Sequence, residues 1–310
     1  MTALRFLYDC DPGADDALAM LLALGRPDAL DMIAVTCVAG NVGLEPVVNN
    51  ARRILELCGR QDIPVYSGAA RPIMASRGRL SIMHGSDGLA GSLLPAPTMP
   101  LAAGHAANEI SRIARAEGKL HICATGPLTN LALALLLDPQ LPDFISALTI
   151  MGGAAFCPGN TTPLAEFNFA VDPHAAAIVF DSGIPITMLG LDVTRQATVT
   201  EEMIRQVQAI ETPVAAEAAH LLINYGSKDP CLHDPAAIAW MLKPEIFESA
   251  AAHVSIIAET GPACGKVVAA VSERHLAGRI PNCLIVIGVK AKEFRSLFIT
   301  SLGKSFQVQA

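Results

Sequence analysis

Short apolar runs alternate with longer helical patterns along most of this chain, and this alternation restricts the possible folds more than any other feature. The apolar runs predict strands at residues 4–8, 32–37, 120–124, 147–151 and 184–189. The helical patterns lie at residues 15–24, 47–58, 106–117, 130–137, 173–181 and 235–242. Such alternation predicts a mostly parallel sheet with helices on both faces. Continuous apolar runs are typical of parallel strands that are buried on both sides.

The last sixty residues follow a different pattern. Apolar runs at residues 254–257, 266–271 and 283–288 predict a small antiparallel appendage, and a helix is expected near residues 292–302. Earlier in the chain, residues 68–100 are rich in Gly, Pro and Ser, and we expect them to be irregular, mobile and close to the site. Because no repeat or linker interrupts the pattern, the prediction is one α/β domain over residues 1–310, with a doubly wound, Rossmann-like sheet.

Charge and cysteine usage limit the partners and the compartment. The formal net charge is −7, which argues against binding to nucleic acid but allows an uncharged nucleoside. The eight cysteines form no C-x-x-C pair, and most lie in apolar runs, as buried thiols of a reducing compartment do. The N-terminus has no signal-peptide pattern, and no apolar stretch is long enough to span a membrane. We therefore expect a cytoplasmic protein with no membrane partner.

Polar residues and glycines follow each predicted strand. In open α/β sheets, ligands bind beyond the carboxyl ends of the strands, where these segments would meet. They are Asp9-Cys10-Asp11-Pro12-Gly13-Ala14-Asp15-Asp16, Ala39-Gly40-Asn41, Thr125-Gly126-Pro127-Leu128-Thr129-Asn130, Gly152-Gly153 and Gly190-Leu191-Asp192. This recurrence predicts a site at that edge of the sheet.

The first of these segments places four carboxylates within eight residues. Unpaired, they would repel one another and raise one another's pKa, whereas a hard cation would relieve the repulsion. Oxygen ligands suit Ca²⁺ or Mg²⁺ better than zinc. The turn at Pro12-Gly13 would let Asp11, Asp15 and Asp16 converge on one ion. The alternative is a helix N-terminal cluster, which would account for Asp15 and Asp16 but not for Asp9 and Asp11.

These motifs together resemble the inosine–uridine-preferring nucleoside hydrolase family. The first acidic segment is similar to the family's signature, and further blocks occur in the family's order over residues 4 to about 240. Those blocks are Ala39-Gly40-Asn41, Thr125-Gly126-Pro127-Leu128-Thr129-Asn130, Met151-Gly152-Gly153, Gly159-Asn160, Ala165-Glu166-Phe167-Asn168 and His233-Asp234-Pro235. Each block alone is weak evidence for the family, but the whole set in this order is specific to it.

The resemblance implies hydrolysis of the N-glycosidic bond of ribonucleosides, and it implies the site residues. Calcium would be held by Asp11, Asp16, Asp234 and the backbone carbonyl of Thr125. Ribose contacts and pocket lining would come from Asp15, Asn41, Glu166, Asn168, Asn160 and Met151. The resemblance also implies a homodimer or homotetramer.

The mechanism expected for such a reaction assigns two catalytic residues. Ribosyl transfer to water passes through an oxocarbenium-like state, which a carboxylate-rich site stabilises. Ca²⁺ acidifies a bound water less than Zn²⁺ does, so the water still needs a base to remove its proton. Asp11 is the predicted base. His233, beside the metal ligand Asp234, is the predicted acid that protonates the departing base. A structural role for His233 is the alternative.

Two candidate pocket residues and one candidate core residue carry imidazole or aromatic side chains. His84 falls where some family members carry a pocket histidine, and Tyr225 precedes His233 and could close over the base. For both residues a packing role stays open. Trp240 lies in an apolar helix and is expected to pack in the core. With no other tryptophan in the chain, a purine-only subtype that sandwiches the base between indoles is disfavoured.

Two other functions fit part of the sequence. A phosphatase of the haloacid dehalogenase type also ends a strand in D-x-D, as Asp9-Cys10-Asp11 does, but Gly13 stands where those enzymes place Thr or Val. A non-catalytic nucleoside-binding protein could use the same fold, but degenerate copies lose acidic ligands that this chain retains. Both alternatives rank below a hydrolase.

Overall fold

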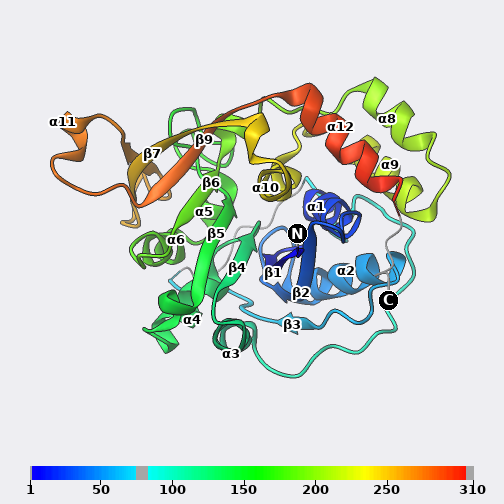
Figure 1. The fold of residues 1–310 in the computed structure, drawn as a ribbon, viewed down its shortest axis with the longest axis horizontal. Helices are drawn as coiled ribbons and strands as arrows, with labels where there is room; N and C mark the ends of the chain where they lie inside the picture. The colour runs from blue at the N-terminus through cyan, green and yellow to red at the C-terminus, as the bar shows by residue number, and fades with distance from the viewer. Residues whose placement is uncertain (1, 75–82, 305–310) are drawn as a thin grey trace.

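The computed structural model describes residues 2–74 and 83–304, and at its centre lies one sheet (Figure 1). Its strands are β1 Leu4–Cys10, β2 Leu30–Cys37, β3 Val65–Ser67, β4 Leu120–Ala124, β5 Ile145–Met151, β6 Ile186–Leu189, β7 Phe247–Ile256, β8 Val267–Ala270 and β9 Cys283–Val289. The order across the sheet is β3-β2-β1-β4-β5-β6-β9-β7-β8. Neighbours from β3 to β9 are parallel, whereas β7 is antiparallel to both β9 and β8.

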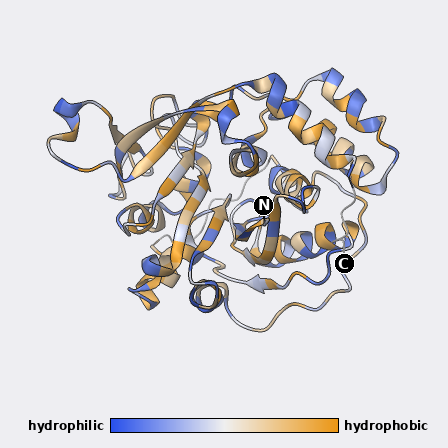
Figure 2. Ribbon diagram, in the orientation of Figure 1, coloured by the Kyte–Doolittle hydropathy of each residue, from blue (hydrophilic) through white to orange (hydrophobic). Residues whose placement is uncertain are grey.

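Helices cover both faces of this sheet. They are α1 Ala14–Leu24, α2 Leu44–Leu57, α3 Ala106–Glu117, α4 Thr129–Leu137, α5 Phe167–Val171, α6 Pro173–Phe180, α7 Leu191–Thr194, α8 Glu201–Gln208, α9 Pro213–Asn224, α10 His233–Leu242, α11 Glu273–Leu276 and α12 Ala291–Leu302. One core cluster joins the sheet to α1, α2, α9, α10 and α12, and a second joins it to α3, α4 and α6. Figure 2 shows mostly hydrophobic colours in the central strands and mixed colours in the outer helices.

Strand β1 shows why the sheet is buried on both faces. Its successive side chains alternate between the two clusters, because Phe6 and Tyr8 belong to the first and Leu7 to the second. All three side chains are fully buried. A strand between two helical layers therefore needs the continuous apolar run that the sequence shows.

Helix α1 is buried along its whole length, which fixes the position of the acidic segment before it. The Asp16 carboxylate accepts a hydrogen bond from the Gly13 amide at 3.0 Å and so stabilises the start of the helix. Asp15 and Asp16 in the first turn also interact favourably with the helix dipole. Asp15 and Asp16 thus stabilise the start of the helix, as the alternative assignment predicted. This role does not prevent the same carboxylates from binding a cation.

The predicted fold class is confirmed, with differences in detail. The sequence did not single out β3, which has three residues, nor helices α8 and α9. The last strand, β9, is antiparallel to β7 as expected but also joins the main sheet parallel to β6. Residues 68–74 and 83–100 are irregular as predicted; residues 75–82 lie outside the described residues, and the predicted mobility of this segment remains a prediction.

Two smaller expectations also hold in the described residues. Trp240 packs against the core cluster with its ring edge-on to Phe247, at a centroid distance of 5.7 Å. Five of the eight cysteines are buried, and all eight are free thiols.

None of the helices between residues 2 and 304 that the structure describes has the length and apolar character needed to cross a bilayer.

Candidate active site

A cavity of about 400 Å³ opens at the carboxyl ends of β1, β4 and β5. Because β2 and β4 lie on opposite sides of β1, this is the point where the strand order reverses, and ligands bind there in folds of this type. The lining residues are Asp15, Asn41, Met83, His84, Thr125, Met151, Asn160, Thr161, Glu166, Phe167, Asn168, Tyr225, Asp229, His233 and Asp234. Every substrate-binding residue predicted from the sequence is among them.

Beneath the cavity lie four aspartates that we call the carboxylate floor: Asp11, Asp15, Asp16 and Asp234. One carboxylate oxygen each of Asp15, Asp16 and Asp234 lies within 4.8 Å of the other two. Asp16 also accepts a hydrogen bond of 2.7 Å from the Thr125 hydroxyl. All four aspartates are buried, so their charges interact strongly.

Asp11 lies in a close-fitting slot beside this group. Its Oδ2 accepts a hydrogen bond of 2.6 Å from the Asn41 amide, while its buried Oδ1 has no hydrogen-bond partner. A Cβ at Gly40 would lie 2.1 Å from Oδ2, and a Cβ at Gly126 would lie 2.7 Å from Oδ1. The glycines of these two motifs are therefore required by the close approach of the Asp11 carboxylate.

The repulsion between the buried carboxylates of the floor suits a bound cation. Burial raises the pKa of Asp11 and Asp234 well above the usual range, and the neighbouring carboxylates raise both further. Burial and then Asp15 raise the pKa of Asp16 to about 7. A cation would remove this penalty, and the unpaired Asp11 Oδ1 together with an all-oxygen donor set suits Ca²⁺ or Mg²⁺. The residues present thus fit a hard divalent ion.

The proposed fourth ligand and the first aspartate have other contacts. The Thr125 carbonyl accepts a hydrogen bond of 2.7 Å from Asn168 Nδ2, which leaves its second lone pair for an ion. Asp9 is not a lining residue. Its Oδ1 instead accepts hydrogen bonds from Thr36 at 2.6 Å and from Asn130 at 2.8 Å. Asp9 therefore contributes to the structure below the floor.

A second set of side chains, which we call the histidine wall, consists of His84, Tyr225, Asp229 and His233. His84 stacks on Tyr225 with a centroid distance of 4.9 Å, and Tyr225 Oη lies 3.4 Å from Asp15 Oδ2. His84 Nδ1 accepts a hydrogen bond of 3.1 Å from the Ala14 amide, so the proton of the neutral ring is on Nε2. Burial lowers the pKa of His84, which favours this neutral form.

His233 is held in the opposite protonation state. Its Nε2 lies 3.1 Å from Asp229 Oδ2, and its Nδ1 lies 2.8 Å from Thr194 Oγ1. Burial alone would lower the pKa of His233, but the hydrogen bonds and charge of its neighbours, chiefly Asp229, raise it to about 10. Although burial opposes it, His233 lowers the pKa of Asp229 to about 2. A charged imidazolium can donate a proton, as the sequence-based assignment requires.

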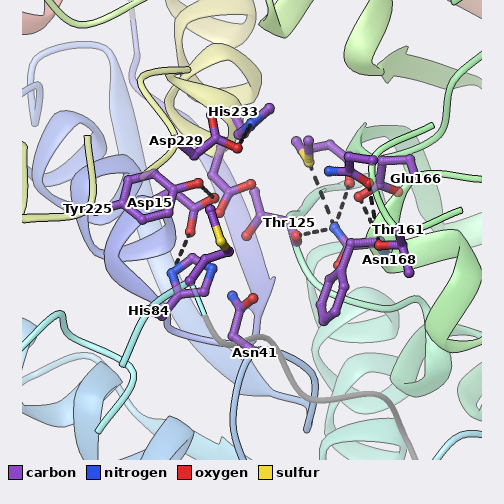
Figure 3. Close-up of a pocket in the computed structure, with 15 residues that line it drawn as sticks. Asp15, Asn41, His84, Thr125, Thr161, Glu166, Asn168, Tyr225, Asp229 and His233 are labelled. Atoms are coloured by element: carbon purple, nitrogen blue, oxygen red, sulfur yellow. Dashed lines mark hydrogen bonds and ion pairs between the residues drawn. The ribbon is translucent and has the colours of Figure 1, made fainter. Parts of the chain in front are cut away.

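Glu166 and Asn168 lie across the pocket from Asp15, His84 and Tyr225, with Thr125 between the two groups (Figure 3). Glu166 precedes α5 and accepts hydrogen bonds from the amides of Asn168, Gly153 and Phe169, at 2.9, 2.8 and 3.3 Å. Burial nevertheless raises its pKa. The pocket thus has carboxylates both below and on one side.

Four lining residues were not predicted: Met83, Thr161, Phe167 and Asp229. Thr161 and Phe167 are next to predicted residues in the Gly159-Asn160 and Glu166-Phe167-Asn168 blocks, so adjacency could have suggested them. Asp229 stands four residues before His233, a spacing that could have indicated a partner for the histidine. Met83 gives no sequence signal beyond its neighbour His84.

Known proteins resemble this chain in sequence and in the fold that holds this site. The model of the inosine-uridine preferring nucleoside hydrolase family matches residues 6–296. This chain belongs to that family. It is therefore a nucleoside hydrolase, an enzyme that splits ribonucleosides into ribose and free base, as the sequence predicted.

Curated relatives and solved structures agree with this assignment. The nucleoside hydrolase is 42% identical to the pyrimidine-specific ribonucleoside hydrolase RihA of Shewanella oneidensis, over 96% of this chain and 95% of the relative. A purine-preferring ribonucleoside hydrolase from Gardnerella vaginalis has a TM-score of 0.89 and 30% identity, covering 96% of this chain and 98% of that one. The plant nucleoside hydrolase PpNRh1 has a TM-score of 0.91 and 28% identity, with 97% and 99% covered.

Proposed function

We propose that this nucleoside hydrolase acts on pyrimidine ribonucleosides and that it binds calcium at the carboxylate floor. The observation that carries the proposal is the floor itself, a set of buried carboxylates under a cavity of about 400 Å³. The relatives named as pyrimidine-specific, at 41 to 42% identity, support the base preference. The described lining also contains no tryptophan to sandwich a purine.

The cation would be held by Asp11, Asp16, Asp234 and the Thr125 carbonyl. When bound, a divalent cation would orient the attacking water and polarise it, and it would neutralise the repulsion within the floor. The unpaired Oδ1 of Asp11 supports a role for this residue, although the closest group of carboxylate oxygens is that of Asp15, Asp16 and Asp234. One carboxylate oxygen of Asp15 would then lie near the ion, and the other could contact the sugar.

The ribose would lie between the two acidic sides of the pocket. Asp15 would face it from one side and Glu166 and Asn168 from the other, and Asn41, Asn160 and Met151 would complete the lining. Positive charge develops on the sugar as the bond to the base breaks, and these carboxylates stabilise it. The number of polar groups devoted to the sugar supports a ribonucleoside as the substrate.

Proton transfer would use one residue of the carboxylate floor and one residue of the histidine wall. Asp11 would accept a proton from the attacking water, because its buried Oδ1 has no hydrogen-bond partner within the fold. His233 would donate a proton to the departing base. Asp229 keeps the ring charged, and Thr194 orients it through Nδ1.

A riboside panel tests this proposal. Uridine, cytidine, inosine, adenosine and guanosine are supplied with calcium, and free ribose is measured after chelation and after calcium is restored. We expect uridine and cytidine to be cleaved faster than the purines, and chelation to stop all cleavage. Equal or higher purine rates would overturn the base preference, and no ribose from any riboside would overturn the proposed substrates altogether.

Some expectations from the sequence remain predictions. These are a homodimer or homotetramer, a cytoplasmic location, the absence of nucleic-acid and membrane partners, and one nucleoside hydrolase domain over residues 1–310. Light scattering coupled to gel filtration measures the first of them directly.

A further inference from the structure

Asp229, Cys231 and His233 form a second group of metal-ligating side chains at the edge of the cavity, which we call the mixed-ligand cluster. A carboxylate oxygen, the Sγ atom and a ring nitrogen of these residues lie within 4.8 Å of one another. His233 Nε2 and Asp229 Oδ2 lie 3.1 Å apart. Asp229 and His233 also line the cavity, so an ion can reach them from solvent.

The backbone places these three side chains together without an ion. Residues 229–232 are not helical, and alternate residues of an extended segment project to the same side. This segment pairs with residues 197–199: the Val199 amide donates to Pro230 at 2.7 Å, and the Leu232 amide donates to Ala197 at 2.9 Å. Helix α10 begins directly after it, at His233. The cluster is therefore held by backbone hydrogen bonds on one side and by a helix on the other.

The donor atoms of the cluster differ in kind from those of the carboxylate floor. Thiolate and imidazole ligands select zinc and similar transition metals, whereas an all-oxygen set selects Ca²⁺ or Mg²⁺. In a tetrahedral zinc site, ligand atoms lie about 3.3–3.6 Å apart, so the pair at 3.1 Å would widen slightly and atoms up to 4.8 Å apart would approach by about 1 Å. We propose that the mixed-ligand cluster binds a transition-metal ion of the Zn²⁺ type, separately from the cation of the floor.

Charge and orientation support such a site. Zn²⁺ bound by one carboxylate, one thiolate and one neutral imidazole has no net charge, which limits its repulsion with the neighbouring ion of the floor. The protons displaced from Cys231 and His233 pass to solvent. His233 Nδ1 lies 2.8 Å from Thr194 Oγ1, an outer contact that orients the ring so that Nε2 faces the cluster.

A consequence for activity follows, and it rests on the proposed function. An ion on His233 Nε2 takes the nitrogen that carries the proton for the departing base. The hydrolase would then be inhibited by zinc, and a chelator selective for zinc over calcium would restore it. Zinc and calcium would act at sites formed by adjacent residues, His233 and Asp234, with opposite effects.

The binding test uses Co²⁺ as a spectroscopic substitute for zinc, added to the full chain in excess calcium. We expect one equivalent to bind with a thiolate-to-cobalt charge-transfer band, and zinc to displace it. The variant Cys231→Ser should lose the band and bind zinc at least about tenfold more weakly. Cys264→Ser and Cys157→Ser are matched controls, because these partly buried thiols lie outside the cluster, and both should keep the band. Absence of the band from the unaltered chain, or its retention in Cys231→Ser, overturns the proposal.

The activity test separates this inference from the proposed function. Zinc inhibition of uridine cleavage is measured for each variant against its own zinc-free rate. We expect at least about a tenfold higher half-inhibitory concentration for Cys231→Ser than for Cys264→Ser. Calcium-dependent ribose release without a cobalt band means that only the metal site fails. A cobalt band without ribose release from any riboside means that only the proposed function fails. Equal inhibition of both variants would overturn inhibition through the cluster.

Discussion

The carboxylate floor and the histidine wall meet in one pocket but are built in different ways. Three of the four floor aspartates come from residues 11–16, which run from the end of β1 into the first turn of α1, and the fully buried helix fixes their position. The wall draws His84 from an irregular segment, Tyr225 from the end of α9 and His233 from the start of α10. Their contacts join residues as far apart as Asp15 and Tyr225.

This difference separates the part of the site that the sheet fixes from the part that loops and helix ends hold. The floor depends on strand ends and glycines, so a change there disturbs the sheet and the site together. The wall consists of side chains on loops and helix ends, which tolerate substitution more easily. We therefore expect the floor to govern the reaction at the sugar, and the wall to govern the departing base.

The substitution Asp11→Asn tests the floor most severely. It removes one charge from the cation site together with the proposed base, so the rate on uridine should fall by more than the ~10²–10⁴-fold typical of a general base alone. Ribose release under saturating calcium measures this loss. Asp31→Asn, a partly exposed aspartate at the other end of β2, is the control and should stay near the original rate. More than about a tenth of the original rate in Asp11→Asn would exclude it from the role.

The sugar hydroxyls test the floor from the side of the substrate. Removing the 2′-hydroxyl leaves buried polar groups unpaired, so 2′-deoxyuridine should lose more than about 10³-fold in kcat/KM relative to uridine. The comparison is made at saturating calcium, and again with inosine and 2′-deoxyinosine. Comparable rates for the two sugars would mean that the floor does not recognise the ribose diol.

The wall is tested by changing the departing base. His233→Ala should slow uridine cleavage by about 10²–10⁴-fold, the range of a general acid, and should affect a p-nitrophenyl riboside much less. The p-nitrophenolate departs without a proton, so it needs no acid. The two rates, measured side by side for both proteins, decide between roles: an equal loss on both substrates would assign His233 a structural or metal-site role.

Calcium affinity and pH provide a quantitative test of the floor. The pKa of Asp16 is about 7 in the ion-free fold, above its ordinary 3.8, so folding favours the protonated form and this group's contribution to stability falls as pH rises from about 4 to 7. The cation binds the ionised form and competes with this proton. Because the raised pKa values of Asp11 and Asp234 act in the same direction, its affinity should fall by at least about a hundredfold from pH 8 to pH 5. Calorimetric titration at the two values checks this, and unchanged affinity would mean that Asp16 binds no ion.

The fold could be predicted from the sequence where one feature decided the structure. The continuous apolar run of β1 and the following helix need burial on both sides, which determines a parallel, doubly wound sheet. Strand β3 escaped prediction because its three residues are too few to show a pattern. The parallel pairing of β9 with β6 joins residues nearly a hundred positions apart, and no local signal indicates such a partner.

The site residues could likewise be predicted where a local feature placed them, and not where a distant contact did. Asp11, Asn41 and Thr125 each follow a strand, so topology alone brings them to one edge. Asp229 was missed because its role depends on a contact with His233 at the start of α10. The tautomer of His84 depends on the Ala14 amide, 70 residues away in sequence, and only the folded chain supplies that donor.

The position of β9 also has a consequence for how the protein is made. This strand is synthesised last but lies between β6 and β7, so neither can complete its pairing until residues 283–289 have left the ribosome. At typical synthesis rates, β7 waits about 2–7 s for this partner. During that time the growing chain presents the unpaired edge of β6, a surface prone to aggregation. A chain cut short before β9 would retain that edge permanently, even though every residue of the pocket would already have been made.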